Sequence, residues 1–391
     1  MNILFLCDEY PPCNHGGIGT LTQVLARELV KQGNNVVVCG FYPYFRKALP
    51  FEIDLGVEVY RHFYGSKLLL QFSRRRFLGD FFNIDSEFKK YNDFLLRIIE
   101  EKKIDIIEIP DFNEAFRYSG PRFIEFSKFN IPVVIKLHGS YNFINSIVWG
   151  QLGKKSIYEK EKSLLNSATK LVAISNFTKE KIKEIYRYTK DIEIIYNGLT
   201  ISDSVKNTDD SKHTVIFAGK ICEMKGVFSL ILAWEKVLQE IPFAKLLIFG
   251  KAEKRDLKKL NLLINDKIKH SIELKGFVNK EKLTEIYSTA ACAIFPSYAE
   301  SFSMAPLESM QVGCPTIYTK RASGPELITN KVNGLIVDPD NIEEIADAII
   351  LMLKDRKSAT EMGKRGSEAI KEKFNIAKIA EEHVSLYNSI I

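Results

Sequence analysis

The sequence lacks the features of a membrane-spanning or exported protein. No stretch of 18 or more apolar residues occurs, so no helix that crosses a membrane is expected. The apolar run from Met1 to Cys7 has no basic start and meets Asp8 and Glu9 at once, unlike a signal peptide. The six cysteines are scattered, and no pair has zinc-finger or thioredoxin spacing. We therefore expect a cytoplasmic protein with reduced cysteines, either soluble or peripheral at the inner face of the membrane.

A strong charge of one sign is also lacking. The 55 basic and 49 acidic residues leave a net charge of +6, most of it in residues 1–200. This excess is too mild for a nucleic-acid binder, although it could favour an anionic ligand or a membrane surface. The chain does have 391 residues, of which 46% are hydrophobic and 11% aromatic, which excludes a disordered or coiled-coil chain and predicts two or three domains.

Apolar runs of strand length alternate with amphipathic helical patterns, which predicts parallel sheets with both faces covered. We predict an α/β fold of two doubly wound, Rossmann-like domains facing a central cleft, with ligands at the carboxyl ends of the strands. The domains are residues 1–200 and 213–374, with a polar linker at 201–212 and a terminal helix at 375–391. The predicted strands are 3–7, 36–39, 104–109, 133–137, 171–174 and 192–195, then 215–218, 245–249, 272–274, 291–295, 316–318 and 335–337.

Three glycines, Gly16, Gly17 and Gly19, lie between the first predicted strand and a helix expected to begin near Thr20. Amides at a helix N-terminus with no side chains in the way can bind phosphate, although the glycines could also form only a tight turn. Their spacing is not G-x-G-x-x-G, and no acid follows the second strand to hold a ribose. Both observations argue against a nicotinamide-dependent enzyme.

A second candidate site follows the first strand of the second predicted domain. Lys220 and Lys225 lie five residues apart on a loop and could converge on a diphosphate, where they would neutralise charge on a leaving phosphate. The alternative is that both are solvated surface lysines, which is the usual fate of lysine.

The most informative motif runs from Phe295 to Met310. A buried strand ends at Phe295, Glu300 lies in the following loop, and a helix opens near Met304, so that Glu308 lies about one turn inside the helix. Two carboxylates beside helix N-terminal amides suit a ligand that has both hydroxyls and phosphates. A capping glutamate and a surface glutamate would be the simpler explanation.

Taken together, these motifs resemble glycosyltransferase family 4, whose members are retaining, nucleotide-sugar-dependent enzymes of the GT-B fold. The resemblance spans nearly the whole chain in the right order and is thin between about residues 49 and 103. The matching elements are Glu300 and Glu308, Lys220 with Lys225-Gly226, Gly16-Gly17-x-Gly19, Leu137-His138-Gly139, Ile195-Tyr196-Asn197-Gly198, Gly324-Pro325-Glu326-Leu327 and Asn333-Gly334-Leu335.

The resemblance implies a role for each candidate residue. Glu308 would hold the ribose of the donor nucleotide, and Glu300 would bind hydroxyls of the donor sugar. Lys220, where the family usually has arginine, and Lys225 would grip the diphosphate. His138 would face the donor sugar, while the three glycines would approach the donor phosphate and the acceptor. The other expected substrate-binding residues are Gly219, Ser301, Phe302, Ser303, Met304 and Ala305.

The resemblance further implies catalysis without a cofactor or a bound metal, and a terminal helix that packs back toward the first domain. Ser301 and Ser303 stand where the family often has glycine. Serine lacks the freedom of glycine at positive φ, which puts the conformation of this loop in question. The sequence has neither a ligand cluster with zinc spacing nor a G-x-S-x-G hydrolase elbow.

A basic, aromatic stretch without acidic residues runs from Val59 to Gly79, and Phe81 and Phe82 lie just beyond it, so the candidate segment is residues 59–82. Such a stretch is typical of a contact with an anionic membrane surface. The alternative is a loop and helix that pack their apolar side into the domain and leave the arginines in solvent.

We therefore predict a retaining, metal-independent glycosyltransferase of the hexosyltransferase type. It would move a sugar from a nucleoside diphosphate sugar, with UDP favoured, to the hydroxyl of a glycan or lipid-linked glycan in cell-surface polysaccharide assembly. Two alternatives stay open: a nucleotide-sugar epimerase or phosphorylase on a related fold, and a two-domain sugar-binding protein. No nucleic-acid partner is expected.

Overall fold

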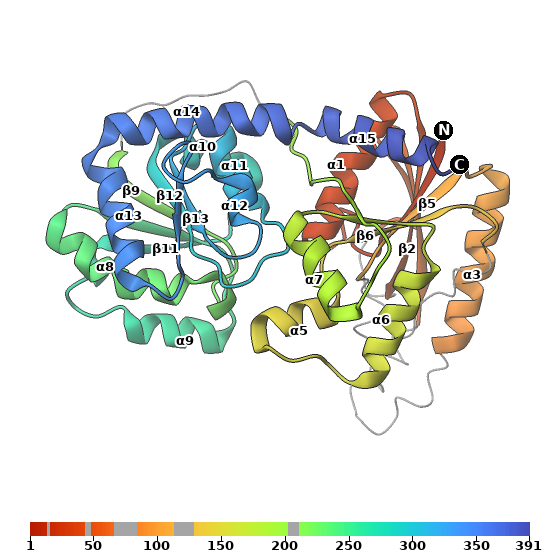
Figure 1. The fold of residues 1–391 in the computed structure, drawn as a ribbon, viewed down its shortest axis with the longest axis horizontal. Coiled ribbons are helices and arrows are strands. Elements are labelled where there is room, and N and C mark those ends of the chain that lie inside the picture. The colour runs from red at the N-terminus through yellow and green to blue at the C-terminus, as the bar shows by residue number, and fades with distance from the viewer. Residues whose placement is uncertain (14–15, 44–47, 66–83, 113–128, 202–210) are drawn as a thin grey trace. The chain divides into compact units, whose positions relative to one another are not determined.

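The computed structural model describes residues 1–13, 16–43, 48–65, 84–112, 129–201 and 211–391. The chain divides into two compact units. Unit 1 comprises Met1–Ile174, Thr178–Gly198 and Ile376–Ile391, and unit 2 comprises Ser175–Phe177 and Leu199–Asn375. In Figure 1 the red, orange and yellow elements and the terminal blue helix belong to unit 1.

Eight strands form the sheet of unit 1, in the order β3-β4-β2-β1-β5-β6-β7-β8. All neighbouring strands are parallel except β3 and β4, which pair antiparallel. The central strands are mostly apolar because helices cover both faces of the sheet, and the exceptions are the buried Glu108 of β5 and Lys136 of β6. The strands are β1 (Asn2–Leu6), β2 (Asn35–Pro43), β3 (Phe51–Asp54), β4 (Val57–Tyr64), β5 (Ile106–Pro110), β6 (Val133–Leu137), β7 (Lys170–Ala173) and β8 (Glu193–Ile194).

Helices from both ends of the chain build the core of unit 1. Leu25 and Leu29 of α1 pack in one apolar cluster with Val36 of β2 and with Ile379 and Tyr387 of α15. Figure 1 shows α1 and α15 side by side, so the last residues of the chain complete the core that the first residues begin. The helices are α1 (Gly17–Lys31), α3 (Ile84–Glu101), α5 (Tyr141–Trp149), α6 (Lys155–Ser167), α7 (Asn176–Tyr186) and α15 (Ile376–Asn388).

Unit 2 has a fully parallel sheet in the order β11-β10-β9-β12-β13-β14. Its core includes the fully buried Trp234 of α8 together with Ile345 and Ile349 of α13. The strands are β9 (Ser211–Ala218), β10 (Lys245–Phe249), β11 (Ile272–Gly276), β12 (Ala290–Phe295), β13 (Thr316–Thr319) and β14 (Leu335–Val337). The helices are α8 (Val227–Glu240), α9 (Lys254–Leu263), α10 (Lys280–Thr289), α11 (Met304–Gln311), α12 (Gly324–Leu327), α13 (Ile342–Lys354) and α14 (Arg356–Lys373), with short 3₁₀ turns η3 (Glu223–Lys225) and η4 (Lys269–Ser271).

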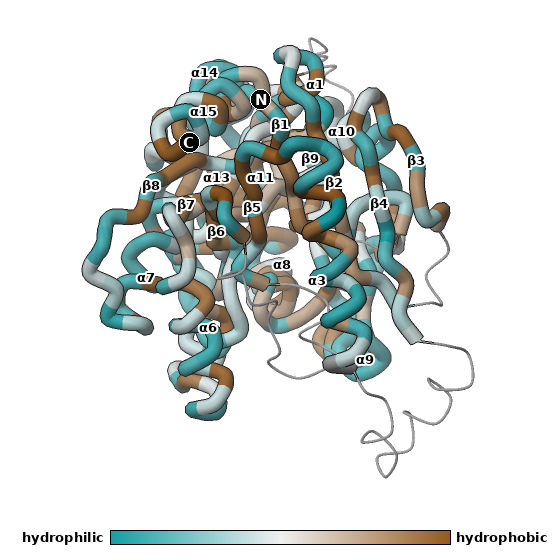
Figure 2. The backbone as a smooth tube through the Cα atoms, turned by 90° about the vertical axis from the view of Figure 1, so that its right-hand side faces the viewer, coloured by the Kyte–Doolittle hydropathy of each residue, from teal (hydrophilic) through white to brown (hydrophobic). Residues whose placement is uncertain are grey.

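The predicted α/β class with two parallel sheets is confirmed, and every predicted strand overlaps a strand of the structure. The hairpin of β3 and β4 was not predicted. In its edge strand β3 the usual alternation is reversed. Phe51 and Ile53 are 45% and 66% exposed, whereas Glu52 bonds to Arg61 of β4 and Asp54 bonds to Arg27 of α1. Figure 2 shows this strand at the edge of the sheet, with brown apolar segments. The inward carboxylates belong to the site described below.

The predicted membrane contact at residues 59–82 is wrong for its first part. Residues 59–64 lie in β4, where Val59 and Arg61 occupy the buried face of the strand. Arg61 is 3% exposed and forms an ion pair with Glu52, so it cannot contact lipid. Residues 66–82 lie outside the described residues. Among the helices that the structure describes, none is both long and apolar enough to cross a membrane.

Candidate active site

Two loops at the carboxyl edge of the unit 2 sheet lie against each other. One follows β9 and the other follows β12. Gly226 lies at φ 71°, and a Cβ atom there would be 1.8 Å from the carbonyl oxygen of Pro296, so this contact requires glycine. The backbone N–H of Tyr298 donates to the carbonyl of Met224 at 2.8 Å. This close approach fixes the position of one loop on the other.

The same approach brings together two residues from separate sequence motifs. Lys225 Nζ contacts Glu300 Oε1, and Ser297 Oγ donates to the same oxygen at 3.2 Å. The side chains of Lys225 and Glu300 are 23% and 11% exposed, so the pair is partly withdrawn from water but reachable. A cation and a carboxylate at this edge can bind a phosphate and a sugar hydroxyl respectively.

Helix α11 begins beside this pair. Ser303 occupies its N-cap position with φ −87° and makes no side-chain capping bond, so it does not block the first amides of the helix. This φ is ordinary for serine, and the loop therefore does not need glycine at this position. Glu308 lies farther along α11, 3.6 Å from Lys280 Nζ, and burial raises its pKa.

Lys220 does not join Lys225 in the structure. Its Nζ pairs with Glu253 Oε1 at 2.7 Å, and the two side chains are 53% and 66% exposed. An ion pair this exposed is weakly held, because water screens both charges. Lys220 can therefore leave Glu253 for a phosphate at little cost.

The loop of Glu300 is also tied to residues 175–177, which belong to unit 2. Ser175 Oγ donates to the carbonyl of Ser301 at 2.9 Å. Glu326, from the Gly324-Pro325-Glu326 motif, accepts the backbone N–H groups of Asn176 and Phe177 at 2.7 and 2.9 Å. The motif thus has a structural role, because it fixes the segment that supports the candidate donor loop.

In unit 1 the glycine-rich segment begins helix α1. A Cβ atom on Gly19 would lie 1.8 Å from the carbonyl oxygen of Glu9, whereas one on Gly17 would meet nothing within 4 Å. Of these two glycines, only Gly19 is therefore required by close approach. The carboxylate of Glu9 accepts the backbone N–H of Gly16 at 3.1 Å, so this amide already has an anionic partner.

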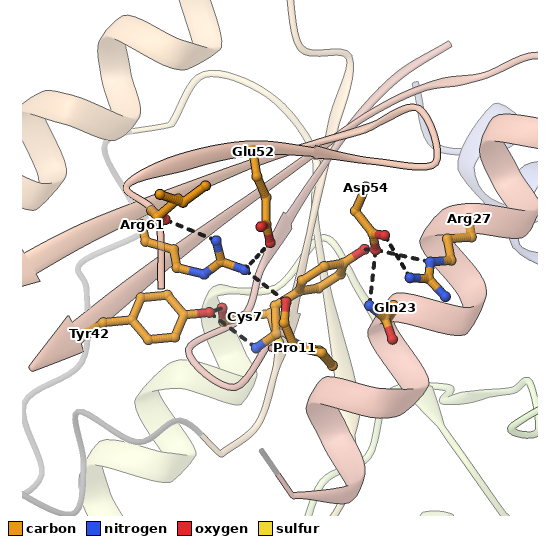
Figure 3. A network of polar contacts seen from close by, with 10 residues as sticks. Cys7, Pro11, Gln23, Arg27, Tyr42, Glu52, Asp54 and Arg61 are labelled. Carbon is orange, nitrogen blue, oxygen red and sulfur yellow. Dashed lines mark hydrogen bonds and ion pairs between the residues drawn. The ribbon is translucent and has the colours of Figure 1, made fainter. Parts of the chain in front are cut away.

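A network of side chains holds the segment that leads into these glycines (Figure 3). Tyr42 Oη donates to the carbonyl of Cys7 at 2.9 Å and accepts the backbone N–H of Tyr10 at 3.1 Å. Arg61, whose side chain is fully buried, donates to the carbonyl of Pro11 at 2.8 Å and pairs with Glu52 at 2.6 Å. The unpredicted hairpin thus supplies Arg61 and Glu52 to hold the base of the glycine-rich segment.

Asp54 of the same hairpin connects the segment to α1. It accepts hydrogen bonds from Tyr10 Oη at 2.8 Å, from Gln23 Nε2 at 3.0 Å and from Arg27, which binds both oxygens at 2.6 and 3.0 Å. The hydrogen bonds from Arg27, Tyr10 and Gln23 lower the pKa of Asp54 despite its partial burial, and it stays ionised. Figure 3 shows Arg27 and Gln23 reaching Asp54 from α1.

His138 follows β6 directly, at the carboxyl edge of the unit 1 sheet. Burial and the nearby charge of Lys136 lower its pKa to about 3, so its imidazole is neutral at physiological pH. Lys136 Nζ lies 2.9 Å from His383 Nε2 of α15, and Tyr387 Oη donates to Glu108 at 2.6 Å. These buried contacts attach α15 beneath the strand that carries His138.

All six cysteines lie among the described residues, and none forms a disulfide. No group of three or more His, Cys, Asp or Glu side chains in the described part of the chain could hold a metal ion. The sequence does contain an Asp-x-Asp pair, Asp338-Pro339-Asp340. Lys320 pairs with Asp338, and Arg321 pairs with both carboxylates, so these acids are already neutralised by cations.

Two family models match adjacent parts of this chain. The model described as Glycosyltransferase Family 4 matches residues 15–203, and the model described as Glycosyl transferases group 1 matches residues 200–369. The chain belongs to glycosyltransferase family 4. The predicted family is confirmed, and this family 4 glycosyltransferase has the GT-B fold.

Relatives of this family 4 glycosyltransferase match either nearly all of the chain or about half of it. An uncharacterised glycosyltransferase of Methanocaldococcus jannaschii is 27% identical over 99% of this chain and 98% of its own. The poly(glycerol-phosphate) alpha-glucosyltransferase of Bacillus subtilis is 26% identical over 52% of this chain, a match that covers 31% of that protein. The structure of Anabaena HepE in complex with UDP-glucose is similar with a TM-score of 0.73 and 19% identity, covering 100% of both chains.

Sequence reasoning missed several residues that shape these sites. Asp111 follows β5 just as His138 follows β6, so an acid placed directly after a buried strand was the available signal. Arg61 and Asp54 gave no such signal, because their role depends on a hairpin whose apolar residues face outward.

Proposed function

We propose that this family 4 glycosyltransferase transfers a hexose from a nucleoside diphosphate sugar, with UDP favoured, and retains the anomeric configuration. The contact of Lys225 with Glu300 beside the N-terminus of α11 carries the proposal. It places a cation, a carboxylate and helix amides within one loop pair, which is the chemistry needed to bind a sugar diphosphate. The complex of HepE with UDP-glucose supports the choice of donor.

In this proposal unit 2 binds the donor. Lys225 and the first amides of α11 stabilise the negative charge that grows on the departing diphosphate. Lys220 joins them by leaving its exposed contact with Glu253. Glu300 accepts hydrogen bonds from the donor sugar, and Glu308 accepts them from the ribose. Catalysis is then electrostatic and positional, and it needs no metal ion.

Unit 1 supplies the acceptor side. Because Glu9 already occupies the amide of Gly16, the glycine-rich segment suits a neutral hydroxyl better than a second phosphate. We therefore propose a glycan or lipid-linked glycan as the acceptor, in cell-surface polysaccharide assembly at the cytoplasmic side. The similarity to the poly(glycerol-phosphate) alpha-glucosyltransferase of Bacillus subtilis supports a polymeric acceptor. His138, neutral and adjacent to the edge of the sheet, contacts the transferred sugar.

The test is a donor panel scored by thermal shift, followed by transfer to glycan acceptors with the product anomer read by NMR. A bound nucleotide sugar stabilises the folded protein in proportion to its affinity. Glu308→Gln should weaken that shift, and Lys236→Ala, which changes a lysine elsewhere on unit 2, should not. Inverted product, or no shift with any nucleotide sugar, would overturn the proposal. Epimerised donor formed without acceptor would instead establish the epimerase alternative.

A further inference from the structure

Asp111 is a buried carboxylate that no motif accounts for. It follows β5 directly and is 2% exposed. The backbone N–H of His138 donates to its Oδ1 at 2.8 Å, and the backbone N–H of Gly139 lies 3.2 Å from each of its oxygens. Its own N–H donates to the carbonyl of Lys136 at 2.9 Å. Asp111 therefore holds the turn that carries His138.

A second buried carboxylate continues this arrangement along the same turn. Glu161 of α6 accepts the backbone N–H groups of Tyr141 and Asn142 at 2.7 and 3.3 Å, as well as Tyr186 Oη at 2.5 Å. Between the two carboxylates, Ser140 caps α5 by accepting the N–H of Phe143. Side chains thus accept the backbone N–H groups of residues 138, 139, 141, 142 and 143 in the segment that follows β6.

Burying the ionised carboxylate of Asp111 lowers the stability of the folded protein. Among the described residues, no cation pairs with it, and burial with the nearby charge of Glu161 raises its pKa from 3.8 to about 7. A neutral residue would be cheaper to bury. Asparagine, however, would place an NH₂ group where the second oxygen of Asp111 faces the backbone N–H of Gly139, and an NH₂ group cannot accept that hydrogen bond. The carboxylate therefore provides an acceptor oxygen on each side of the Gly139 N–H, while one of the two oxygens also accepts from His138.

Gly139 shows why the turn needs such support. It lies at φ 119°, a region that residues other than glycine rarely adopt. Glycine in turn allows many other conformations, so the peptide chain alone does not fix the direction in which His138 leaves the strand. Two hydrogen bonds to one rigid, buried carboxylate do fix it.

We propose that Asp111 is a positioning residue that sets the orientation of His138 toward the transferred sugar. The inference rests on the proposed function, because that function gives His138 its contact with the donor. Misplacement of a group by about 1 Å can reduce turnover by ~10²-fold. We therefore expect Asp111→Asn to lower kcat by at least ~10-fold, with the donor KM within about twofold, because unit 2 holds the nucleotide.

Asp105→Asn is the matched control. Asp105 precedes the same strand and its carboxylate accepts the backbone N–H of Asn2 at 2.7 Å, so this variant makes the same substitution beside a backbone N–H at the opposite end of β5. It should leave kcat and KM unchanged. A double-mutant cycle with His138→Ala then separates positioning from general damage. In that background Asp111→Asn should cost less than about twofold, since the group it positions is gone.

Hydrogen exchange of the amides of residues 138 and 139 gives a readout that does not depend on activity. Protection of both amides should fall in Asp111→Asn and stay unchanged in Asp105→Asn. Unchanged protection, or full additivity in the cycle, would overturn the inference. If Asp111→Asn fails to fold, Asp111→Ser takes its place. A wild-type protein that transfers no sugar would refute the proposed function alone, because the exchange measurement still tests Asp111.

Discussion

Burying Asp111 as an anion should make unit 1 less stable as the pH rises. Its pKa is raised from 3.8 to about 7 in the folded protein, mainly by burial. Below pH 4 the carboxyl is protonated in both the folded and unfolded states and carries no penalty. Between about pH 4 and 7 the unfolded chain releases the proton while the folded state keeps it. The penalty therefore grows across this window and is constant above it.

The size of the effect follows from the two pKa values. Each unit of difference corresponds to about 1.4 kcal/mol, and the part of the penalty that develops between pH 5 and pH 8 is about 2.5 kcal/mol. Asp111→Asn removes this titration. The free energy of unfolding of the variant, relative to the wild type, should therefore rise by about 2.5 kcal/mol from pH 5 to pH 8. A hydrogen bond lost in the variant lowers its free energy of unfolding equally at pH 5 and at pH 8. That loss therefore cancels when the two pH values are compared.

Urea unfolding at the two pH values measures this difference. Peptides that span β5 and β6, followed by hydrogen-exchange mass spectrometry, report unit 1 separately from unit 2. The difference in the free energy of unfolding between Asp111→Asn and the wild type could instead be the same at pH 5 and pH 8. That result would show that Asp111 has the same pKa in the folded protein as in the unfolded chain. The buried carboxylate would then carry no pH-dependent penalty in the folded protein.

Further outcomes concern the proposed sites. Lys225→Ala should lower kcat/KM by ~10²–10³-fold while the protein stays folded, and an unchanged value would remove this lysine from the mechanism. Glu308→Gln should mainly raise the donor KM and Glu300→Gln should mainly lower kcat, so the reverse ranking would exchange their roles. Gly19→Ala should lower the Tm and abolish transfer, whereas Gly17→Ala, with open space at its Cβ, should be tolerated in both assays. Activity should survive excess chelator, and a loss reversed by Mg²⁺ or Mn²⁺ would contradict the metal-independent mechanism.

The strands and the donor loops could be predicted because their signals are local. A continuous apolar run such as β12 indicates a strand that is buried on both faces, whatever its neighbours are. The loop with Glu300 follows such a run and is followed by a helix, so its place at the carboxyl edge of a parallel sheet needs no long-range information. The contact of Lys225 with Glu300 was harder to predict from the sequence, because it depends on the close approach of Gly226 to Pro296.

The hairpin of β3 and β4 could not be predicted in the same way. Its edge strand exposes Phe51 and Ile53 and points Glu52 and Asp54 toward other residues, which inverts the usual alternation. The buried arginine of β4 reads from the sequence as a solvent or membrane residue, because only the fold places Glu52 beside it.

In unit 1, acidic residues interrupt the apolar pattern at positions where their side chains bond to loops. Asp54 reaches Tyr10 across 44 residues of sequence, and Asp111 reaches His138 across 27. Each acid bonds to a segment that leaves the carboxyl edge of the sheet, where ligands bind in this fold. Apolar residues could stabilise the same strands more cheaply, but they cannot accept a hydrogen bond from a loop. Inward-facing acids therefore indicate the loops whose geometry the reaction requires. Asp111 is the acid whose burial costs most, and its double-mutant cycle with His138 tests this conclusion.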